Sequence, residues 1–174
     1  LVLPKAEQIP SDNYKKGDTI RAIVKSVENK NGSPVIILSR TSEIFLQRLF
    51  EMEVPEIFDG TVQIKSVARE AGSRTKMAVY SVDENIDPIG ACVGPKGSRV
   101  KNIVDELGDE KIDIIKYSEN PAEFISAALS PSKVVSVDVN EEEKSAVVIV
   151  PDYQLSLAIG KEGQNARLAA KLTN

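Results

Sequence analysis

The chain has 174 residues, of which 41% are hydrophobic and 28% are charged, so it can bury a core and is not disordered by composition. It has no histidine and one cysteine, Cys92, which excludes a Ser-His-Asp triad, a Cys-His dyad, a metal site with histidine ligands and an internal disulfide. No apolar stretch approaches the roughly 18 residues that a membrane span needs. We therefore expect a non-enzymatic, cytoplasmic protein that contacts no membrane and has no metal or other cofactor. Cys92 is expected to be a small buried apolar residue.

Charge is unevenly distributed along the chain, whose net charge is −4 from 22 basic and 26 acidic residues. Residues 1–40 carry seven basic and four acidic groups, residues 41–120 carry ten and fifteen, and residues 121–174 carry five and seven. This balance argues against binding of nucleic acid by bulk attraction. Two short basic stretches, 94–101 and 160–171, lie inside the acidic segments, so any contact with phosphates should be local.

The first predicted element is a β-hairpin over residues 18–40. Residues 18–28 and 34–40 are rich in apolar residues in partial alternation, and Asn31-Gly32 lies between them. An Asn-Gly pair between two such runs is typical of a tight hairpin turn.

A helix, a second hairpin and two further helices follow. Thr41 or Ser42 can cap the first helix, Pro55 disrupts it, and its apolar residues at helical spacing are Ile44, Phe45, Leu49 and Met52. Residues 61–69 and 74–82 alternate as strands, with Val62, Ile64 and Val67 facing inward. The pattern then predicts a helix at 87–93, a glycine-rich turn, a helix at 98–107 and a strand at 111–117.

The same order of elements then recurs. It comprises a helix from Pro121 to Leu129, strands at 133–139 and 145–150, and helices at 152–159 and 164–172. The repeat is clearest in Gly94-Pro95-Lys96-Gly97 and Gly160-Lys161-Glu162-Gly163, whose first glycines are 66 positions apart (160 minus 94). One Gly-x-x-Gly is also a common turn pattern, but two at a fixed offset in the same context are far more specific. Such a loop at a helix N-terminus favours phosphate oxygens.

This layout resembles the type II KH domain, a binder of single-stranded nucleic acid whose Gly-x-x-Gly loop clamps four nucleotides. The segment from Tyr14 to Arg40 resembles the second half of an S1 domain, an OB-type barrel. S1, KH and KH in this order resemble the RNA-binding core of the NusA family of bacterial transcription factors. Close local matches include Leu3-Pro4-Lys5, the segments 50–57, 64–70 and 90–94, and Leu155 to Arg167.

The resemblance implies an α+β fold with a partial S1/OB-type β segment followed by two tandem type II KH domains. The expected domains are residues 1–40, the C-terminal half of S1; 41–118, the first KH domain; and 121–174, the second KH domain without its final strand. Only three residues, 118–120, lie between the last strand of the first KH domain and the first helix of the second. They span at most about 10 Å, so we expect both loops to face one continuous RNA path. We read the chain as a fragment that lacks the family's N-terminal, polymerase-contacting domain.

The implied function is that of the single-stranded RNA-binding core of a transcription elongation, termination and antitermination factor. The expected partners are nascent single-stranded RNA, RNA polymerase mainly through regions outside this chain, and other transcription factors, with the chain itself a monomer. The residues carried over to RNA binding are those of the two loops and the helix turns after them: Gly94, Pro95, Lys96, Gly97, Ser98, Arg99, Lys101, Gly160, Lys161, Glu162, Gly163, Gln164, Asn165 and Arg167.

Four apolar and three basic residues are further candidates. Ile89, Val93, Leu155 and Ile159 are expected to line apolar grooves for the bases, since an aromatic content of 5% suits aliphatic grooves better than stacking platforms. Arg21, Lys25 and Arg40 are either a solvated face of the barrel or RNA contacts. Glu162 weakens the second loop because it puts negative charge where a phosphate would lie.

Two other functions stay open at the level of sequence. One is a cytosolic KH protein of translation or ribosome assembly. The other is a protein–protein scaffold with degenerate KH folds, which the acidic balance favours. RNA binding that depends on the Gly-x-x-Gly residues separates both RNA-binding functions from the scaffold. Binding to transcription complexes separates the transcription factor from the protein of translation or ribosome assembly.

Overall fold

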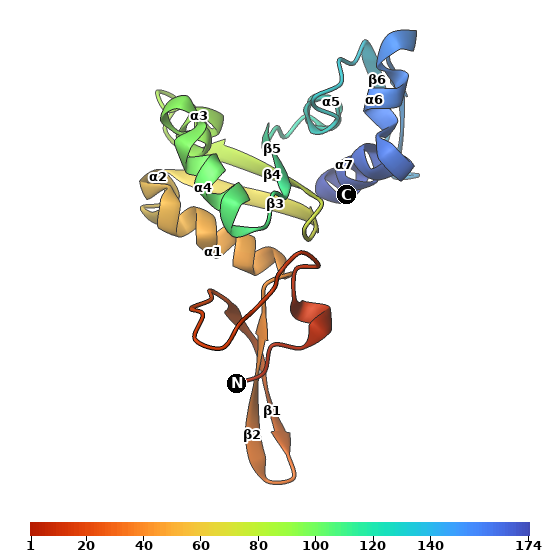
Figure 1. The fold of residues 1–174 in the computed structure, drawn as a ribbon. Coiled ribbons are helices and arrows are strands. Elements are labelled where there is room, and N and C mark those ends of the chain that lie inside the picture. The colour runs from red at the N-terminus through yellow and green to blue at the C-terminus, as the bar shows by residue number, and fades with distance from the viewer.

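A computed structural model describes all 174 residues, in three parts that Figure 1 shows. We call residues 1–40 the N-terminal segment, 41–118 the first unit and 121–174 the second unit. Both units combine helices with strands, which confirms the predicted α+β class. None of the helices is long and apolar enough to cross a membrane.

The N-terminal segment consists of a short 3-10 helix and one antiparallel hairpin that projects away from both units (Figure 1). Strand β1 covers Ile23–Lys30 and β2 covers Ser33–Ser39. Asn31 and Gly32 have φ values of 52° and 80°, as the predicted tight turn requires. The predicted start of the first strand at residue 18 is wrong, because residues 18–22 have no neighbouring strand with which to form a ladder.

The first unit packs four helices on one face of a three-stranded sheet. Strand β4 lies in the middle, antiparallel to β3 and parallel to β5. The elements in chain order are α1 (Glu43–Glu53), α2 (Pro55–Phe58), β3 (Val62–Glu70), β4 (Arg74–Ser81), α3 (Pro88–Val93), α4 (Ser98–Glu106) and β5 (Lys111–Lys116).

Helix α1 begins at a serine cap, since the Ser42 side chain accepts a hydrogen bond from the backbone N–H of Ile44. Phe45 and Leu49 are buried. Ile44 and Met52, which fit the same helical spacing, are 53% and 69% exposed. The buried stripe consists of Phe45, Leu46, Leu49 and Phe50, which turns Ile44 and Met52 toward solvent.

A β-bulge explains the uneven spacing of the apolar residues in β3. The pairing of β3 with β4 shifts between Ile64 and Ser66. Val62, Ile64 and Val67 therefore all pack in the core beneath the helices, as predicted, although Ile64 and Val67 are three positions apart. Ala68 points to the opposite face of the sheet.

The second unit repeats this order with a two-stranded sheet. Its elements are α5 (Pro121–Ala128), β6 (Ser136–Asn140), β7 (Ser145–Ile149), α6 (Leu155–Ile159) and α7 (Gln164–Thr173). The strand predicted from residue 133 begins three residues later. Asn120 caps α5 by accepting hydrogen bonds from the N–H groups of Ala122 and Glu123.

The two units share a hydrophobic core. Ala68, Ala78 and Ile115 of the first sheet pack against residues of α5 and α7, including the fully buried Leu168. Tyr80, Tyr117 and Phe124 continue this contact as two edge-to-face ring pairs, with centroids 6.4 and 5.2 Å apart. Figure 1 shows α7 beside the first sheet. The second unit is therefore held by packing as well as by a short linker.

The N-terminal segment is joined to the first unit by Ile9, which is 1% exposed in the first core, and by Arg40. The Arg40 guanidinium donates to Asp12 Oδ2 at 2.8 Å, to Glu106 Oε1 at 3.0 Å and to the carbonyl of Arg21 at 2.6 Å. Arg40 is only 4% exposed. It is thus neither a solvated residue nor one that RNA can reach, which corrects both interpretations of this side chain.

Candidate nucleic-acid interface

The two Gly-x-x-Gly loops have nearly the same backbone. The φ and ψ values are 75° and 173° at Gly94 against 78° and 171° at Gly160. The third positions, Lys96 and Glu162, have 53° and 28° against 55° and 27°. The closing glycines, Gly97 and Gly163, have 74° and 14° against 75° and 11°. Residues of opposite charge therefore occupy the same left-handed conformation.

The first and last glycines of each loop are required for different reasons. A Cβ on Gly94 would lie 2.5 Å from Cγ of Arg99, and a Cβ on Gly160 would lie 2.7 Å from the backbone nitrogen of Asn165. A Cβ on Gly97 or Gly163 would meet nothing within 4 Å, so only the positive φ favours glycine there. The first glycine makes room for a neighbour, and the last one turns the chain.

Each loop leads directly into a helix whose first turn no side chain caps. Helix α4 begins at Ser98 after Gly97, and α7 begins at Gln164 after Gly163. The backbone N–H groups and the positive dipole end of such a turn attract anions. Exposed side chains around these turns are those of Pro95, Lys96, Ser98, Lys101, Lys161, Glu162 and Arg167.

Not every predicted residue is free to contact a ligand. Asn165 is 2% exposed, and its Nδ2 donates to the carbonyls of Leu129 and Ala158, both at 3.0 Å. The prediction that Asn165 contacts RNA is therefore wrong in this structure, because the side chain lies inside the second unit. The partly buried Arg99 donates to the Ala91 carbonyl at 2.7 Å and to Glu56 Oε2 at 2.9 Å.

Arg167 and Gln164 join the second loop to the first unit through Glu70. Arg167 Nε donates to Glu70 Oε1 at 2.7 Å, and Gln164 Nε2 donates to Glu70 Oε2 at 2.6 Å. Hydrogen bonds first from Arg167 and then from Gln164 hold the pKa of Glu70 below its usual value. Lys101, at the position equivalent to Arg167, instead pairs with Asp105 of its own helix at 2.7 Å.

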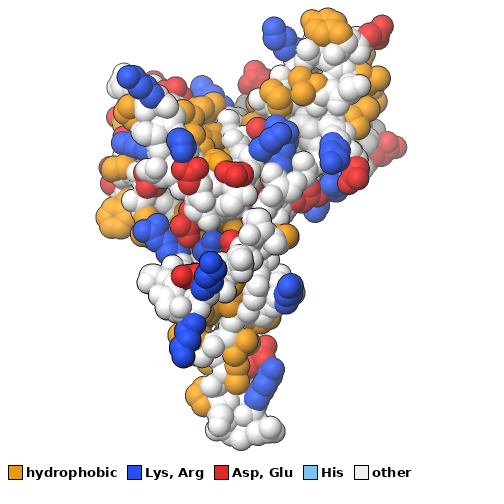
Figure 2. Space-filling model, viewed as in Figure 1, with side chains coloured by type: hydrophobic (Ala, Val, Ile, Leu, Met, Phe, Trp, Pro, Cys, Tyr) orange, Lys and Arg blue, Asp and Glu red, His pale blue; other side chains and the backbone are white.

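The remaining basic candidates lie on the N-terminal segment. Lys25 is exposed and pairs with Glu7. Arg21 is exposed, and its role in RNA binding stays a prediction. Figure 2 shows basic and acidic side chains interspersed over the face in view, rather than one continuous basic surface.

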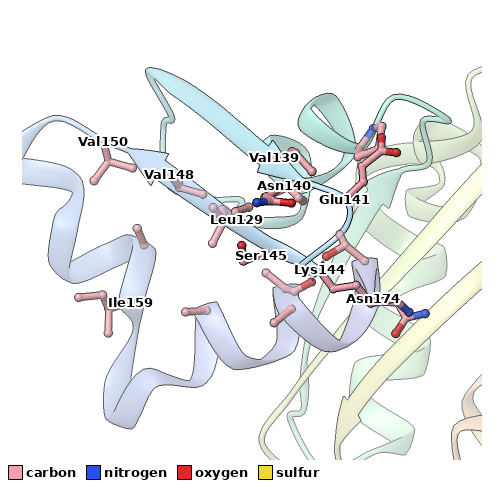
Figure 3. A pocket seen from close by; sticks show the side chains of 18 of the residues that line it. Leu129, Val139, Asn140, Glu141, Lys144, Ser145, Val148, Val150, Ile159 and Asn174 are labelled. Atoms are coloured by element: carbon pink, nitrogen blue, oxygen red, sulfur yellow. Dashed lines mark hydrogen bonds between the residues drawn. The ribbon is translucent and has the colours of Figure 1, made fainter.

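An apolar cavity of about 540 Å³ lies between the β6–β7 hairpin and helices α5, α6 and α7 (Figure 3). Leu155 and Ile159 contribute to its lining and are 52% and 46% exposed. Strand β7 has one neighbouring strand, whereas its counterpart β4 has two. In the first unit Ile89 is only partly buried and packs against the core, and Val93 is partly buried as well.

Cys92 is fully buried in the first core, as predicted. Burial raises the pKa of its thiol to about 12, with a smaller contribution from the charge of Glu56. The thiol therefore stays neutral at physiological pH and behaves as an apolar side chain.

Comparisons with known families agree with these features. A family model described as the NusA-like first KH domain matches residues 40–117, and one described as the NusA-like second KH domain matches residues 121–174. Together they match 78 plus 54, or 132, of the 174 residues. The chain belongs to the NusA-like KH family.

Similar proteins include several named transcription termination/antitermination protein NusA. The chain is 62% identical to the one from Halalkalibacterium halodurans, 61% to that of Bacillus subtilis and 50% to that of Thermus thermophilus. The matches cover 98–99% of this chain but only 44–46% of those relatives. The chain thus spans about half the length of the curated relatives that it matches.

A solved structure supports the fold alone. The crystal structure of APE1850 is 23% identical, with a TM-score of 0.53, and the match covers 72% of this chain and 87% of that one. The first and second units are accordingly KH domains, and the expectation of tandem KH folds is confirmed.

No local pattern in the sequence indicates which residues hold the loops in place. Glu56 lies 43 positions before Arg99, and Glu70 lies 97 positions before Arg167. Glu56 and Glu70 lie in segments that match the family, but no local pattern links either of them to a Gly-x-x-Gly loop. Only the fold brings them to the loops.

Proposed function

We propose that this chain is the single-stranded RNA-binding core of a factor of transcription elongation, termination and antitermination. The observation that carries the proposal is the pair of Gly-x-x-Gly loops with matching backbone dihedrals, each at the N-terminus of a longer helix. In KH domains this loop clamps the backbone of four nucleotides. Two such loops on one body suit a single extended strand.

The rigid attachment of the second KH domain supports one continuous RNA path. Helix α7 contributes Leu168 to the shared core, and the two residues Gln164 and Arg167 tie its first turns to Glu70 of the first domain. Because the loop at 160–163 immediately precedes α7, its position relative to the first domain is set by these contacts. When one RNA strand has bound the first loop, its binding to the second loop is intramolecular and needs no further ordering of the protein. Both factors increase the affinity.

The two loops have unequal parts in this proposal. Lys96 supplies a charge-assisted contact to phosphate at the first loop, supported by the uncapped N–H groups of α4. At the second loop Lys161 has this role, and Glu162 reduces the attraction. The bases occupy apolar surface beside the loops, including Leu155 and Ile159 at the cavity of the second domain.

The wider role rests on the relatives, which are named as transcription termination/antitermination proteins. We propose that RNA polymerase is contacted mainly by regions outside this chain and that the protein acts in the bacterial cytoplasm without catalysing a reaction. A KH protein of translation or ribosome assembly is the competing function. The two functions are separated by measuring binding of the chain to an assembled transcription complex in competition with free RNA. Binding is expected for the transcription factor and not for the protein of translation or ribosome assembly.

Fluorescence titration of a labelled single-stranded RNA tests the proposal directly. The variant Lys96→Asp with Lys161→Asp should bind at least about 30-fold more weakly, because two charge-assisted contacts become repulsive. Lys30→Asp, at the tip of the β1–β2 hairpin, makes the same type of charge change away from both loops and should leave the affinity within about twofold. Equal losses in both proteins, or no binding by the wild type, would contradict the proposal.

A further inference from the structure

Arg99 and Asn165 occupy equivalent positions in the two KH domains, 66 residues apart (165 minus 99). Each is the second residue of the helix that follows its loop. One is a long cation and the other a short neutral amide. Both side chains nevertheless turn back into the domain and donate to a carbonyl of the short helix before the loop, Arg99 to Ala91 at 2.7 Å and Asn165 to Ala158 at 3.0 Å.

Each of the two side chains also reaches the helices at the start of its own domain. Arg99 donates to Glu56 Oε2 in α2 at 2.9 Å, and Asn165 donates to the carbonyl of Leu129, directly after α5, at 3.0 Å. Each residue therefore connects three segments: the helix before the loop, the helix after it and the N-terminal helices of the domain. A different chemical group makes the same set of connections in each case.

Both residues also press against the first glycine of their loop. The side chain of Arg99 and the backbone of Asn165 occupy the space that a Cβ on Gly94 or Gly160 would need. The glycine and the residue five positions later thus form one close contact that fixes the angle between the two helices. The Oδ1 atom of Asn165 is buried with no hydrogen-bond partner, so only the Nδ2 group of this amide connects the segments by hydrogen bonds.

We propose that Arg99 and Asn165 are positioning residues, here called brace residues, which hold each Gly-x-x-Gly loop in its phosphate-binding form without contacting RNA. The proposal rests on the proposed RNA-binding function. The resemblance to the family places both residues among the RNA contacts, whereas in this proposal their side chains bond within the protein. For Arg99 the pairing with Glu56 already balances the charge that a phosphate contact would use.

The test compares Arg99→Met and Asn165→Leu, which keep side-chain bulk but remove the donors, with the conservative Arg99→Lys. In NMR spectra of the free protein, the amide signals of the affected loop should shift or broaden. RNA affinity should fall about tenfold for Arg99→Met and Asn165→Leu, and Arg99→Lys should recover part of it. The salt dependence of binding by Arg99→Met should stay that of the wild type, because no phosphate contact is lost.

One variant controls for simple loss of stability. Ile103→Val trims a buried side chain in the first core, beyond the first turn of α4, and should keep wild-type affinity at a temperature where the protein is folded. If it loses as much affinity as Arg99→Met, the proposal fails.

The proposal also fails if Arg99→Met leaves the free loop signals unchanged and lowers the slope of log K against log salt by about 0.7, the value for one phosphate contact. If the wild type binds no RNA, the proposed function fails instead. The NMR signals of the free variants then still test the brace residues: changed loop signals support their positioning role, and unchanged loop signals contradict it.

Discussion

The two Gly-x-x-Gly loops differ in charge and agree in shape. Pro95-Lys96 in the first loop carries one positive charge, whereas Lys161-Glu162 in the second carries none in sum. Their backbone angles nonetheless agree within about three degrees at each compared position. The glycines and the brace residues therefore set the loop conformation, and the two central side chains are left to set the charge that a ligand meets.

The helices after the loops, α4 and α7, occupy the same position in their domains but pack against different neighbours. Leu168 and Leu172 of α7 are buried against the first sheet. The equivalent residues of α4, 66 positions earlier, are Asn102, which is exposed, and Glu106, which binds Arg40 of the N-terminal segment. The repeat has thus kept its loop while the surface of the following helix has changed with its partner.

Exchanging these helix residues should give the largest effect. Leu168→Asn puts a polar side chain into the shared core and should lower the free energy of unfolding by about 3–5 kcal/mol. Urea unfolding measures the loss, and NMR relaxation should show the domains reorienting separately if the second domain stays folded. The reciprocal Asn102→Leu on the exposed face of α4 should change stability by less than about 1 kcal/mol. Similar effects of the two substitutions would refute the assignment of a shared core.

The next largest effect should distinguish the two glycines of one loop. Gly94→Ala combines a backbone region that only glycine adopts readily with a clash against Arg99, and should destabilise the first domain by about 3 kcal/mol. Gly97→Ala meets only the conformational penalty, about 1 kcal/mol. Thermal unfolding of both variants, at matched concentration, checks the ratio. A larger loss at Gly97 would mean that the first glycine is not the crowded one.

Placing the charge of the second loop in the first should weaken RNA binding. Lys96→Glu keeps the backbone, because Glu162 already adopts the same positive φ of 55°. The affinity for single-stranded RNA should fall by about 2 kcal/mol, roughly 30-fold, through a lost charge-assisted contact and new repulsion. The melting temperature should stay within about two degrees of the wild type. Unchanged affinity would remove Lys96 from the interface.

The reverse exchange should give the smallest effect. Glu162→Lys removes an opposing charge from the second loop and should raise the affinity by about 0.5–1 kcal/mol, roughly two- to fivefold at low salt. The gain should shrink as salt is added, which a titration at two salt concentrations will show. A loss of affinity would mean that Glu162 itself makes a favourable contact with the ligand.

Local patterns in the sequence predicted much of the fold. The Asn-Gly turn, the serine cap of α1 and the apolar residues Val62 and Ile64 are signals that act within a few residues, and each has its expected place. The start of β1 and the exposure of Met52 depend instead on which neighbour a segment acquires. Those neighbours are distant in the sequence, and periodicity does not encode them.

The candidate site divides in the same way. The loops and their exposed lysines follow from the repeated motif, whereas Asn165 and Arg40 turn inward because partners elsewhere in the chain supply carbonyls and carboxylates. A motif identifies which residues are near a ligand-binding turn. It does not tell which of them face the protein, since that choice depends on long-range packing.

The central claim is that the chain binds single-stranded RNA through two local phosphate sites. Titrations over a range of salt concentrations test this claim most directly. The ligands are two unrelated single-stranded RNAs and one RNA duplex. Lys96, Lys101 and Lys161 predict a slope of log K against log salt of about −2, and no steeper than about −3 if Arg167 also meets a phosphate. The two strands should differ in affinity and the duplex should bind poorly, because KH grooves take unstacked bases. A slope beyond about −6 with equal affinity for all three ligands would contradict the account.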